Sequence, residues 1–195
     1  PIILPNNMIE TFAFTSRKNR SFGVYKFSTT GTPSLVSRLK LFSYPENISI
    51  TSIKPDGSAE FLLSGNSFDG LSIVSLINNV LVEKKLLQNR LFQNAQFIDI
   101  NSDGYEDIAA LNSIENKLHL FFNNSRSFYN ELRYINLDHD VLSMKIFDVN
   151  YDQFKDIVVS TLSGLIIYFG DASASYSKFV EIYTSYAVDK FIIGD

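Results

Sequence analysis

The sequence predicts an all-β fold built from repeated units of four short antiparallel strands. Three observations support this prediction. A nine-residue acidic segment at 99–107 recurs at 148–156, 49 positions later. Short runs rich in aliphatic and aromatic residues follow both copies, and no long stretch shows helical periodicity. Self-similarity at a fixed period indicates that one supersecondary unit is used several times.

The repeat is clearest in the second half of the chain. "FIDINSDGYEDIAAL" (97–111) aligns with "IFDVNYDQFKDIVVS" (146–160), and "NKLHLFF" (116–122) aligns with "SGLIIYF" (163–169). In the unit that contains the first acidic segment we expect strands at about 95–100, 107–112, 117–123 and 131–137. Four strands in each 40–50-residue unit are typical of a β-propeller blade.

Weaker copies extend the repeat toward the start of the chain. "ITSIKPDGSAEFLLS" (50–64) keeps Asp56 and Gly57, whereas "ETFAFTS" (10–16) and "GVYKFST" (23–29) keep only the strands. We therefore expect four blades of about 47 residues and the first strand of a fifth, as part of a larger ring. A complete small propeller is the alternative. The predicted boundaries are 1–47, 48–94, 95–143 and 144–189, with 190–195 starting the next blade.

One segment leaves its secondary structure open. "LVEKKLLQNRLF" (81–92) could form a helix, but it lacks a clear cap and falls where the other units have a fourth strand. The chain also begins at Pro1 rather than at a methionine, so we expect its true start to have been removed or to lie outside this sequence.

Composition excludes several classes of protein. Hydrophobic residues make up 45% of the 195 residues, which is enough for a large core. The net charge of −4 and the absence of a long basic cluster argue against a nucleic-acid partner. The lack of cysteine excludes disulfides and thiol chemistry. No apolar run approaches the roughly 18 residues of a membrane span.

The acidic segments have the composition of a site for a hard cation. Alternate residues of a short turning loop can direct their oxygens at one centre, and calcium takes six to eight oxygen ligands. Side chains would bind at positions 1, 3, 5 and 9, and position 7 would offer its backbone carbonyl. The predicted ligands are Asp99, Asn101, Asp103, Tyr105 and Asp107 in one loop, and Asp148, Asn150, Asp152, Phe154 and Asp156 in the other.

Details of the loops refine this prediction of two Ca²⁺ sites. Gly104 permits a sharp turn at position 6, and Gln153 can adopt the same geometry only at a cost of about 1–2 kcal/mol. The second site should therefore be weaker. An EF-hand is rejected because position 12 is Ala110 or Val159 instead of glutamate. A metal-free acidic turn is the alternative. In the earlier, degenerate copy we expect no calcium, and Lys54 either replaces the cation or points to solvent.

The pattern F-x-D-x-N-x-D-G-x-x-D-I resembles the calcium loop of FG-GAP/VCBS-type β-propeller repeats, as in integrin α-subunit head domains and many bacterial surface proteins. The resemblance covers the chain as a fold and the two acidic loops as metal sites. It implies an extracellular or periplasmic scaffold for adhesion, sugar binding or an appended enzyme. It does not imply one activity.

The remaining motifs favour binding over catalysis. No nucleophile elbow, phosphate loop or paired-histidine motif is present, and we interpret His119 and His139 mainly as structural residues. The sequence therefore predicts that the chain is not an enzyme. Tyr129 and Tyr176, in segments between third and fourth strands, are candidates for stacking on a ligand, although both could instead cover the core.

We expect an extracellular or cell-surface adhesion module, with the periplasm as a further possibility, that binds a protein or a glycan. A structural spacer in a larger secreted protein and the propeller of a polysaccharide-active enzyme are the alternatives. The extracellular expectation rests on calcium, because small open loops suit the high calcium concentration outside cells.

Overall fold

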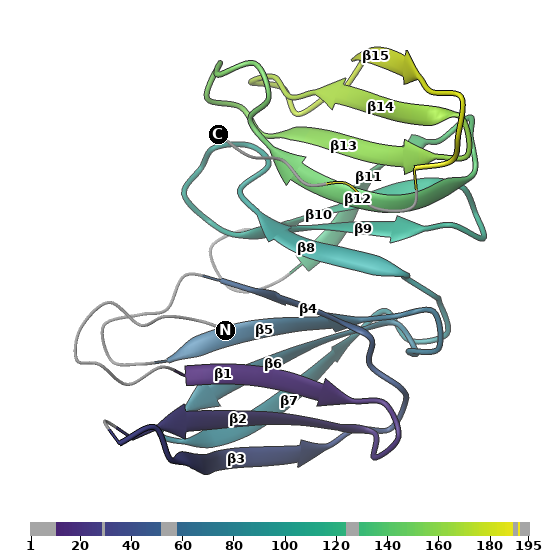
Figure 1. Ribbon diagram of the computed structural model, residues 1–195. Coiled ribbons are helices and arrows are strands. Elements are labelled where there is room, and N and C mark those ends of the chain that lie inside the picture. Colours follow the sequence, from purple (N-terminus) through teal and green to yellow (C-terminus); the bar gives the residue numbers. More distant parts are fainter. Residues whose placement is uncertain (1–10, 29, 52–57, 124–128, 189–190, 192–195) are drawn as a thin grey trace. The chain divides into compact units, whose positions relative to one another are not determined.

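The computed structural model describes residues 11–28, 30–51, 58–123, 129–188 and 191. Within these ranges every regular element is a β-strand, which confirms the all-β prediction (Figure 1). No helix in the described part of the chain has the length and hydropathy required to cross a membrane. The expected strand start at 190–195 and Lys54 lie outside the description, except for Phe191.

The strands form four antiparallel sheets in which neighbours along the chain pair. The first sheet contains β1 (Thr11–Ser16), β2 (Ser21–Phe27) and β3 (Pro33–Lys40). The second contains β4 (Asn47–Ile50), β5 (Ala59–Ser64), β6 (Leu71–Ile77) and β7 (Val80–Leu86). The third contains β8 (Asn94–Ile98), β9 (Asp107–Asn112), β10 (Lys117–Asn123) and β11 (Tyr129–Asn136). The fourth contains β12 (Val141–Phe147), β13 (Asp156–Thr161), β14 (Gly164–Phe169) and β15 (Lys178–Tyr183).

The segment with the open helical alternative is a strand. β7 pairs along its length with β6, and the two strands are joined by Asn78 and Asn79, which have φ angles of 50° and 62°. Asparagines in this backbone region close tight two-residue hairpins. Exposure alternates over the first half of β7, where Leu81 is buried between exposed Val80 and Val82. The side-chain period is therefore two, as in a strand.

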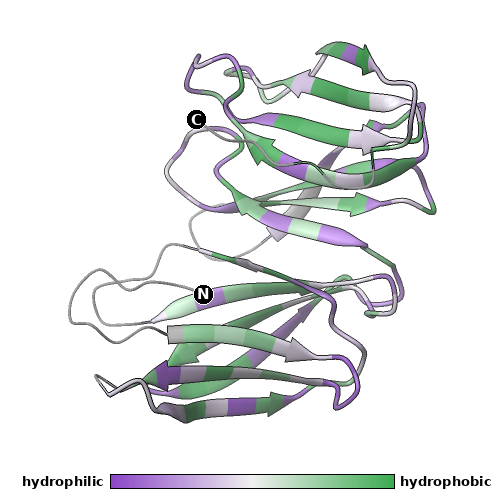
Figure 2. Cartoon of the chain, in the orientation of Figure 1, coloured by the Kyte–Doolittle hydropathy of each residue, from purple (hydrophilic) through white to green (hydrophobic). Residues whose placement is uncertain are grey.

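The middle strands of the sheets are the most hydrophobic (Figure 2). β9 and β13 are buried at every position, whereas β15 is exposed at most of its positions. Continuous apolar runs are typical of strands covered on both faces. β15 therefore forms an exposed edge of the fourth sheet, and the middle strands β9 and β13 are covered on both faces.

The chain divides into two compact units, Pro1–Ala95 and Gln96–Asp195. In the first unit the core lies between the first and second sheets and contains Phe22, Val24, Phe61 and Leu63. In the second unit the core lies between the third and fourth sheets and contains Leu111, Leu118, Met144 and Val159. Both acidic loops belong to the second unit.

Candidate metal centre

The two acidic loops occupy the same place in consecutive sheets. One connects β8 to β9 and the other connects β12 to β13, so each joins the first strand of a sheet to the second. Each loop ends with a buried aspartate, Asp107 or Asp156, that is also the first residue of the following strand. The two segments that the sequence aligned are therefore structurally equivalent.

Within the first loop, three predicted ligands gather around a few backbone amides. The Asp103 amide donates to Asp99 Oδ1 at 3.0 Å and to Asn101 Oδ1 at 3.2 Å. The Gly104 amide donates to Asp99 Oδ2 at 2.9 Å, and the Tyr105 amide donates to Asp103 Oδ1 at 2.9 Å. Oxygens of Asp99 and Asn101 thus share one donor, which places them on the same side of the loop.

The second loop repeats this network bond for bond. The Asp152 amide donates to Asp148 Oδ1 and to Asn150 Oδ1, both at 3.1 Å. The Gln153 amide donates to Asp148 Oδ2, and the Phe154 amide donates to Asp152 Oδ1, both at 2.9 Å. In both loops the asparagine Nδ2 also donates to the aspartate two positions later, at 3.0 Å and 2.8 Å.

The backbone of the two loops turns in the same way. Positions 4 and 6 have positive φ angles: 58° at Ser102 and 85° at Gly104, then 61° at Tyr151 and 78° at Gln153. Glycine tolerates this region freely, whereas a residue with a Cβ atom is strained there. Gln153 adopts the left-handed geometry that the sequence predicted for it, so the second loop carries more strain than the first.

The aspartates at position 9 bind backbone amides. Asp107 accepts from the Ile100 amide at 3.0 Å and from the Asn123 amide at 2.6 Å. Asp156 accepts from the Val149 amide at 2.8 Å and from the Gly170 amide at 2.8 Å. Each carboxylate therefore connects the start of its loop to the end of the third strand. A carboxylate oxygen has two lone pairs, so these bonds leave acceptor capacity.

Burial and neighbouring acids raise the pKa of two carboxyl groups in the first loop. The pKa of Asp107 rises to about 6, because burial disfavours the charged form and because Asp103 and Asp99 repel it, although the two amide bonds act in the opposite direction. Burial, with repulsion from Asp99, also raises the pKa of Glu106. Both shifts would be relieved by a cation in the loop.

The donor set suits a hard, oxygen-binding cation. Positions 1, 3 and 5 bring carboxylate and amide oxygens together, and oxygens of these kinds are the ligands that calcium prefers. Among the described residues, however, no three His, Asp or Glu side chains gather closely enough to hold an ion by themselves. The loop brings the side chains of Asp99, Asn101 and Asp103 together. The Asp107 carboxylate instead binds backbone amides.

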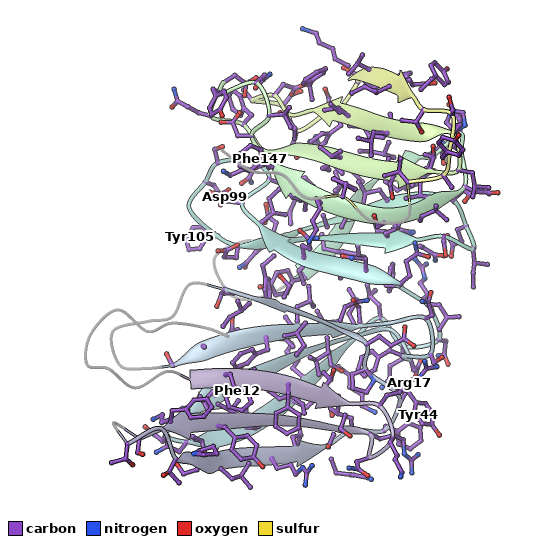
Figure 3. All side chains as sticks on the ribbon, in the orientation of Figure 1. Phe12, Arg17, Tyr44, Asp99, Tyr105 and Phe147 are labelled. Carbon is purple, nitrogen blue, oxygen red and sulfur yellow. The ribbon has the colours of Figure 1, made fainter. Side chains whose placement is uncertain are left out.

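The aromatic residues at position 7 differ between the loops. Tyr105 has 47% of its surface exposed, and it extends outward from the loop that contains Asp99 (Figure 3). Phe154 is half-buried. Because the carbonyl is the predicted ligand at this position, the side chain is available for packing or for contact with solvent.

The other candidate residues take different positions. His119 is buried on β10, and its Nε2 lies 3.7 Å from Glu115. The Nε2 of His139 lies 3.7 Å from Glu181 on β15. Tyr129 is the first residue of β11 and is half-buried. Tyr176 is not available for stacking on a ligand: it is buried in the core, and its hydroxyl donates to the Lys155 carbonyl at 3.0 Å.

Sequence reasoning missed one polar turn. Asp171, after β14, accepts hydrogen bonds from the backbone and hydroxyl groups of Ser173 and from Ser175. These bonds lower the pKa of Asp171 to about 2. The spacing Asp-x-Ser-x-Ser is the signal that could have revealed this turn, because aspartate and serine side chains commonly bond to the backbone two residues on.

Comparison with solved structures decides the architecture. A structure described as BBS1N in complex with ARL6DN, soaked with lead, matches 100% of this chain and 61% of that chain, with a TM-score of 0.65 and 12% identity. The fold is a β-propeller. A structure described as a candidate gluconolactonase matches 90% of this chain and 60% of that one, with a TM-score of 0.52 and 12% identity. This chain thus spans about 60% of the length of either propeller.

At 12% identity the two matches show the fold alone. No protein-family model and no curated protein matches the chain. The general prediction of a β-propeller with four-stranded antiparallel blades is therefore confirmed, and the narrower resemblance to FG-GAP/VCBS repeats stays a proposal. The predicted blade boundaries also stay predictions.

The comparisons correct one prediction. The sequence predicted that the chain is not an enzyme, and that conclusion is wrong because a candidate gluconolactonase shares the propeller fold. Propellers are scaffolds on which unrelated functions are built. The lack of a familiar catalytic motif in this sequence consequently does not exclude catalysis.

Proposed function

We propose that the chain is a protein-interaction module of the FG-GAP/VCBS type, that two calcium ions stabilise its second unit, and that it works at the cell surface or elsewhere outside the cell. The observation that carries the proposal is the matching network of the two acidic loops. In both loops the residues at positions 1, 3 and 5 accept or exchange the same five hydrogen bonds.

Chance is a poor explanation for this agreement. A surface turn needs no more than one aspartate or asparagine to bind its own backbone. Here two carboxylates and an amide converge twice, in segments of different sequence at positions 2, 4, 6, 7 and 8. A shared requirement for oxygen ligands explains why these residue types are combined with two left-handed backbone positions.

When bound, calcium would supply positive charge where the carboxylates repel one another. Asp99, Asn101 and Asp103 would hold it in the first loop, and Asp148, Asn150 and Asp152 in the second. Asp107 and Asp156 would keep the ends of the loops together and offer further carboxylate oxygens to the ion. A ligand that binds only the folded state adds its binding free energy to stability.

The interaction role is supported by the fold and by one structural neighbour. The BBS1N propeller was solved in complex with ARL6DN, which shows that a propeller of this kind can bind a protein partner. The structure removes one reason to expect a glycan, because Tyr176 is buried. The extracellular setting follows from the proposed calcium dependence, because small open loops bind calcium weakly and need it in abundance.

Isothermal titration calorimetry of the calcium-free chain tests the metal sites. We expect two binding events, the weaker one in the Gln153-containing loop. Asp103→Ala should abolish one event and Asp152→Ala the other. Two events that persist in both variants, or no heat in the wild-type chain, would contradict the proposal.

A further inference from the structure

An exposed surface at one end of the first unit combines cations with aromatic rings. We define this basic aromatic patch as Arg20, Lys40, Phe42, Tyr44 and Lys85. The guanidinium carbon of Arg20 lies 5.7 Å from the centroid of the Tyr44 ring, and Lys85 Nζ lies 4.7 Å from that of Phe42. Phe42 and Tyr44 are 76% and 42% exposed.

Backbone contacts hold the patch together. Arg20 Nη1 lies 3.5 Å from the Phe42 carbonyl oxygen, and Lys40 Nζ donates to the Asn19 carbonyl at 2.6 Å. The β1–β2 turn, the segment after β3 and the exposed edge of β7 therefore meet at this surface. Arg17 and Tyr44 mark the same end of the unit in Figure 3.

The acids that the structure describes leave the positive charge of the patch without an ion-pair partner. Glu46 is close by, but it forms its ion pair with Arg17 at 3.1 Å and accepts the Asn66 amide at 2.9 Å. Among the described residues, no carboxylate forms an ion pair with Arg20, Lys40 or Lys85. Three cations thus remain available to an external anion.

Charge is distributed unevenly along the chain, and the first unit, which contains the patch, is the basic one. The first unit contains ten Lys and Arg against six Asp and Glu, whereas the second contains seven against fifteen. The patch belongs to the basic unit. Its charge is therefore a property of one half of the chain and is hidden in the overall net charge of −4.

The third sheet shows that the fold does not require these side chains. Arg20 and Asn116 close equivalent turns, both with a φ of 48°, and their carbonyls accept from the amides of Leu41 and Leu137 at 2.7 Å and 2.8 Å. Both leucines are buried. By this alignment, the third sheet has Asn136, Asp138 and Asp140 where the patch has Lys40, Phe42 and Tyr44.

The backbone conformation at position 20 is also unfavourable for arginine. A φ of 48° lies in the left-handed region, which asparagine occupies more readily than most other residues that have a side chain. The third sheet places asparagine there, as local backbone preference predicts. An arginine held in an unfavourable backbone region points to a role outside the fold.

We propose that the basic aromatic patch binds an acidic segment of a partner protein. Carboxylates of that segment would pair with Arg20, Lys40 and Lys85, and its apolar side chains would cover Phe42 and Tyr44. Arginine, tyrosine and phenylalanine are enriched at protein interfaces, where they combine apolar area with directional contacts. The net charge of −4 disfavours a long polyanion such as nucleic acid. This inference rests on the proposed interaction role.

The test is fluorescence anisotropy with the full chain and a short labelled peptide that alternates glutamate with leucine. The control peptide has glutamine at every glutamate position. We expect the acidic peptide to bind, the control peptide to bind at least about tenfold more weakly, and affinity to fall as salt is raised. Heparin and a short DNA duplex are the competing probes.

Arg20→Asn is the informative variant. It should weaken peptide binding several-fold while the melting midpoint stays the same or rises, because Asn116 already fills the equivalent turn. A purely structural Arg20 would lower the midpoint instead. Lys40→Gln/Lys85→Gln should weaken binding roughly tenfold. The matched control, Lys145→Gln/Lys178→Gln, removes two exposed cations from the second unit and should leave binding unchanged.

Three results would overturn the inference: no binding of the acidic peptide, equal effects of the patch and control variants, or tighter binding of heparin or DNA than of the peptide. Calcium calorimetry on the same preparation separates this failure from a failure of the proposed function. A chain that binds calcium at both loops but ignores the peptide would refute the patch alone.

Discussion

At position 6 of the acidic loops, the effect of one backbone angle on stability can be measured separately from the effect of packing. Gly104 and Gln153 occupy the same place with φ angles of 85° and 78°. A Cβ atom built at Gly104 meets no atom within 4 Å, so a substitution there is strained by the backbone alone. The pair therefore offers reciprocal substitutions that leave packing unchanged.

We expect Gln153→Gly to raise the free energy of unfolding by roughly 0.5–1 kcal/mol, because relief of strain exceeds the added freedom of the unfolded chain. Gly104→Gln should lower it by about 1 kcal/mol. Urea unfolding of both variants measures the effects. A loss of stability in Gln153→Gly would show that the glutamine side chain contributes a contact.

We expect Asp107 to make stability depend on pH in the absence of calcium. Its pKa is about 6 in the folded chain and about 3.9 when unfolded, so folding favours its protonated form. Stability from this group is fully present below about pH 4 and is lost as pH rises through 6. Asp103 and Asp99 add to the effect through repulsion.

Denaturation in EDTA from pH 4.5 to 7 tests this dependence against Asp107→Asn, which does not titrate. The wild-type chain should lose more stability than the variant as pH rises. Saturating calcium should reduce the difference, because the cation compensates the carboxylate charge. Parallel pH profiles for the two proteins without calcium would show that Asp107 titrates normally.

At the scale of strands, the position 9 aspartates connect the two ends of each blade's inner strands. Asp156 binds the Val149 amide in the loop and the Gly170 amide after β14. Asparagine keeps one acceptor oxygen and replaces the other with a donor. The Asp156→Asn variant would consequently leave a buried amide facing a donor, which costs about 1–3 kcal/mol.

The loss of stability in Asp156→Asn should appear in EDTA as well as in calcium. This distinguishes position 9 of the loop from position 5. Asp152→Ala, on the exposed side of the loop, should lose most of its effect once calcium is removed from the wild-type chain. Thermal unfolding of both variants with and without calcium makes the comparison. Equal calcium dependence in the two variants would show that Asp156 acts as a ligand and not mainly as a connection between strands.

Much of the architecture could be predicted because the repeat constrains it. The expected strands at 107–112 and 117–123 coincide with β9 and β10, since turn residues punctuate short apolar runs there. β7 was open to a helical interpretation because a short apolar run flanked by Glu83, Lys84 and Lys85 fits either period. Pairing with β6 makes this segment a strand. That pairing cannot be predicted from the residues of β7 alone.

The candidate site could be predicted only in part. The motif predicts the ligand types and the left-handed backbone at Gly104 and Gln153. The structure places oxygens of Asp99, Asn101 and Asp103 together. The attachment of Asp107 to Asn123 could not be foreseen, because it joins residues from different strands. The sequence left the position of Tyr176 open for the same reason: its burial depends on how the fourth sheet packs.

At the scale of the whole molecule, two calcium ions would cancel the formal net charge of −4. Their effect should concentrate in the second unit, which contains both loops and the larger share of acids. Stability of that unit would then follow the calcium concentration, whereas the basic first unit would present its patch independently of the metal.

A thermal melt with calcium titrated after EDTA treatment tests whether calcium stabilises the folded chain through both loops. At 100 times the dissociation constant each site adds about 2.7 kcal/mol, which is several degrees in a chain of this size. The melting midpoint should rise with calcium, and the rise should be smaller in Asp103→Ala and in Asp152→Ala than in the wild-type chain. A midpoint that does not respond to calcium in the wild-type chain would contradict it, and the two loops would then be acidic turns of a metal-free propeller.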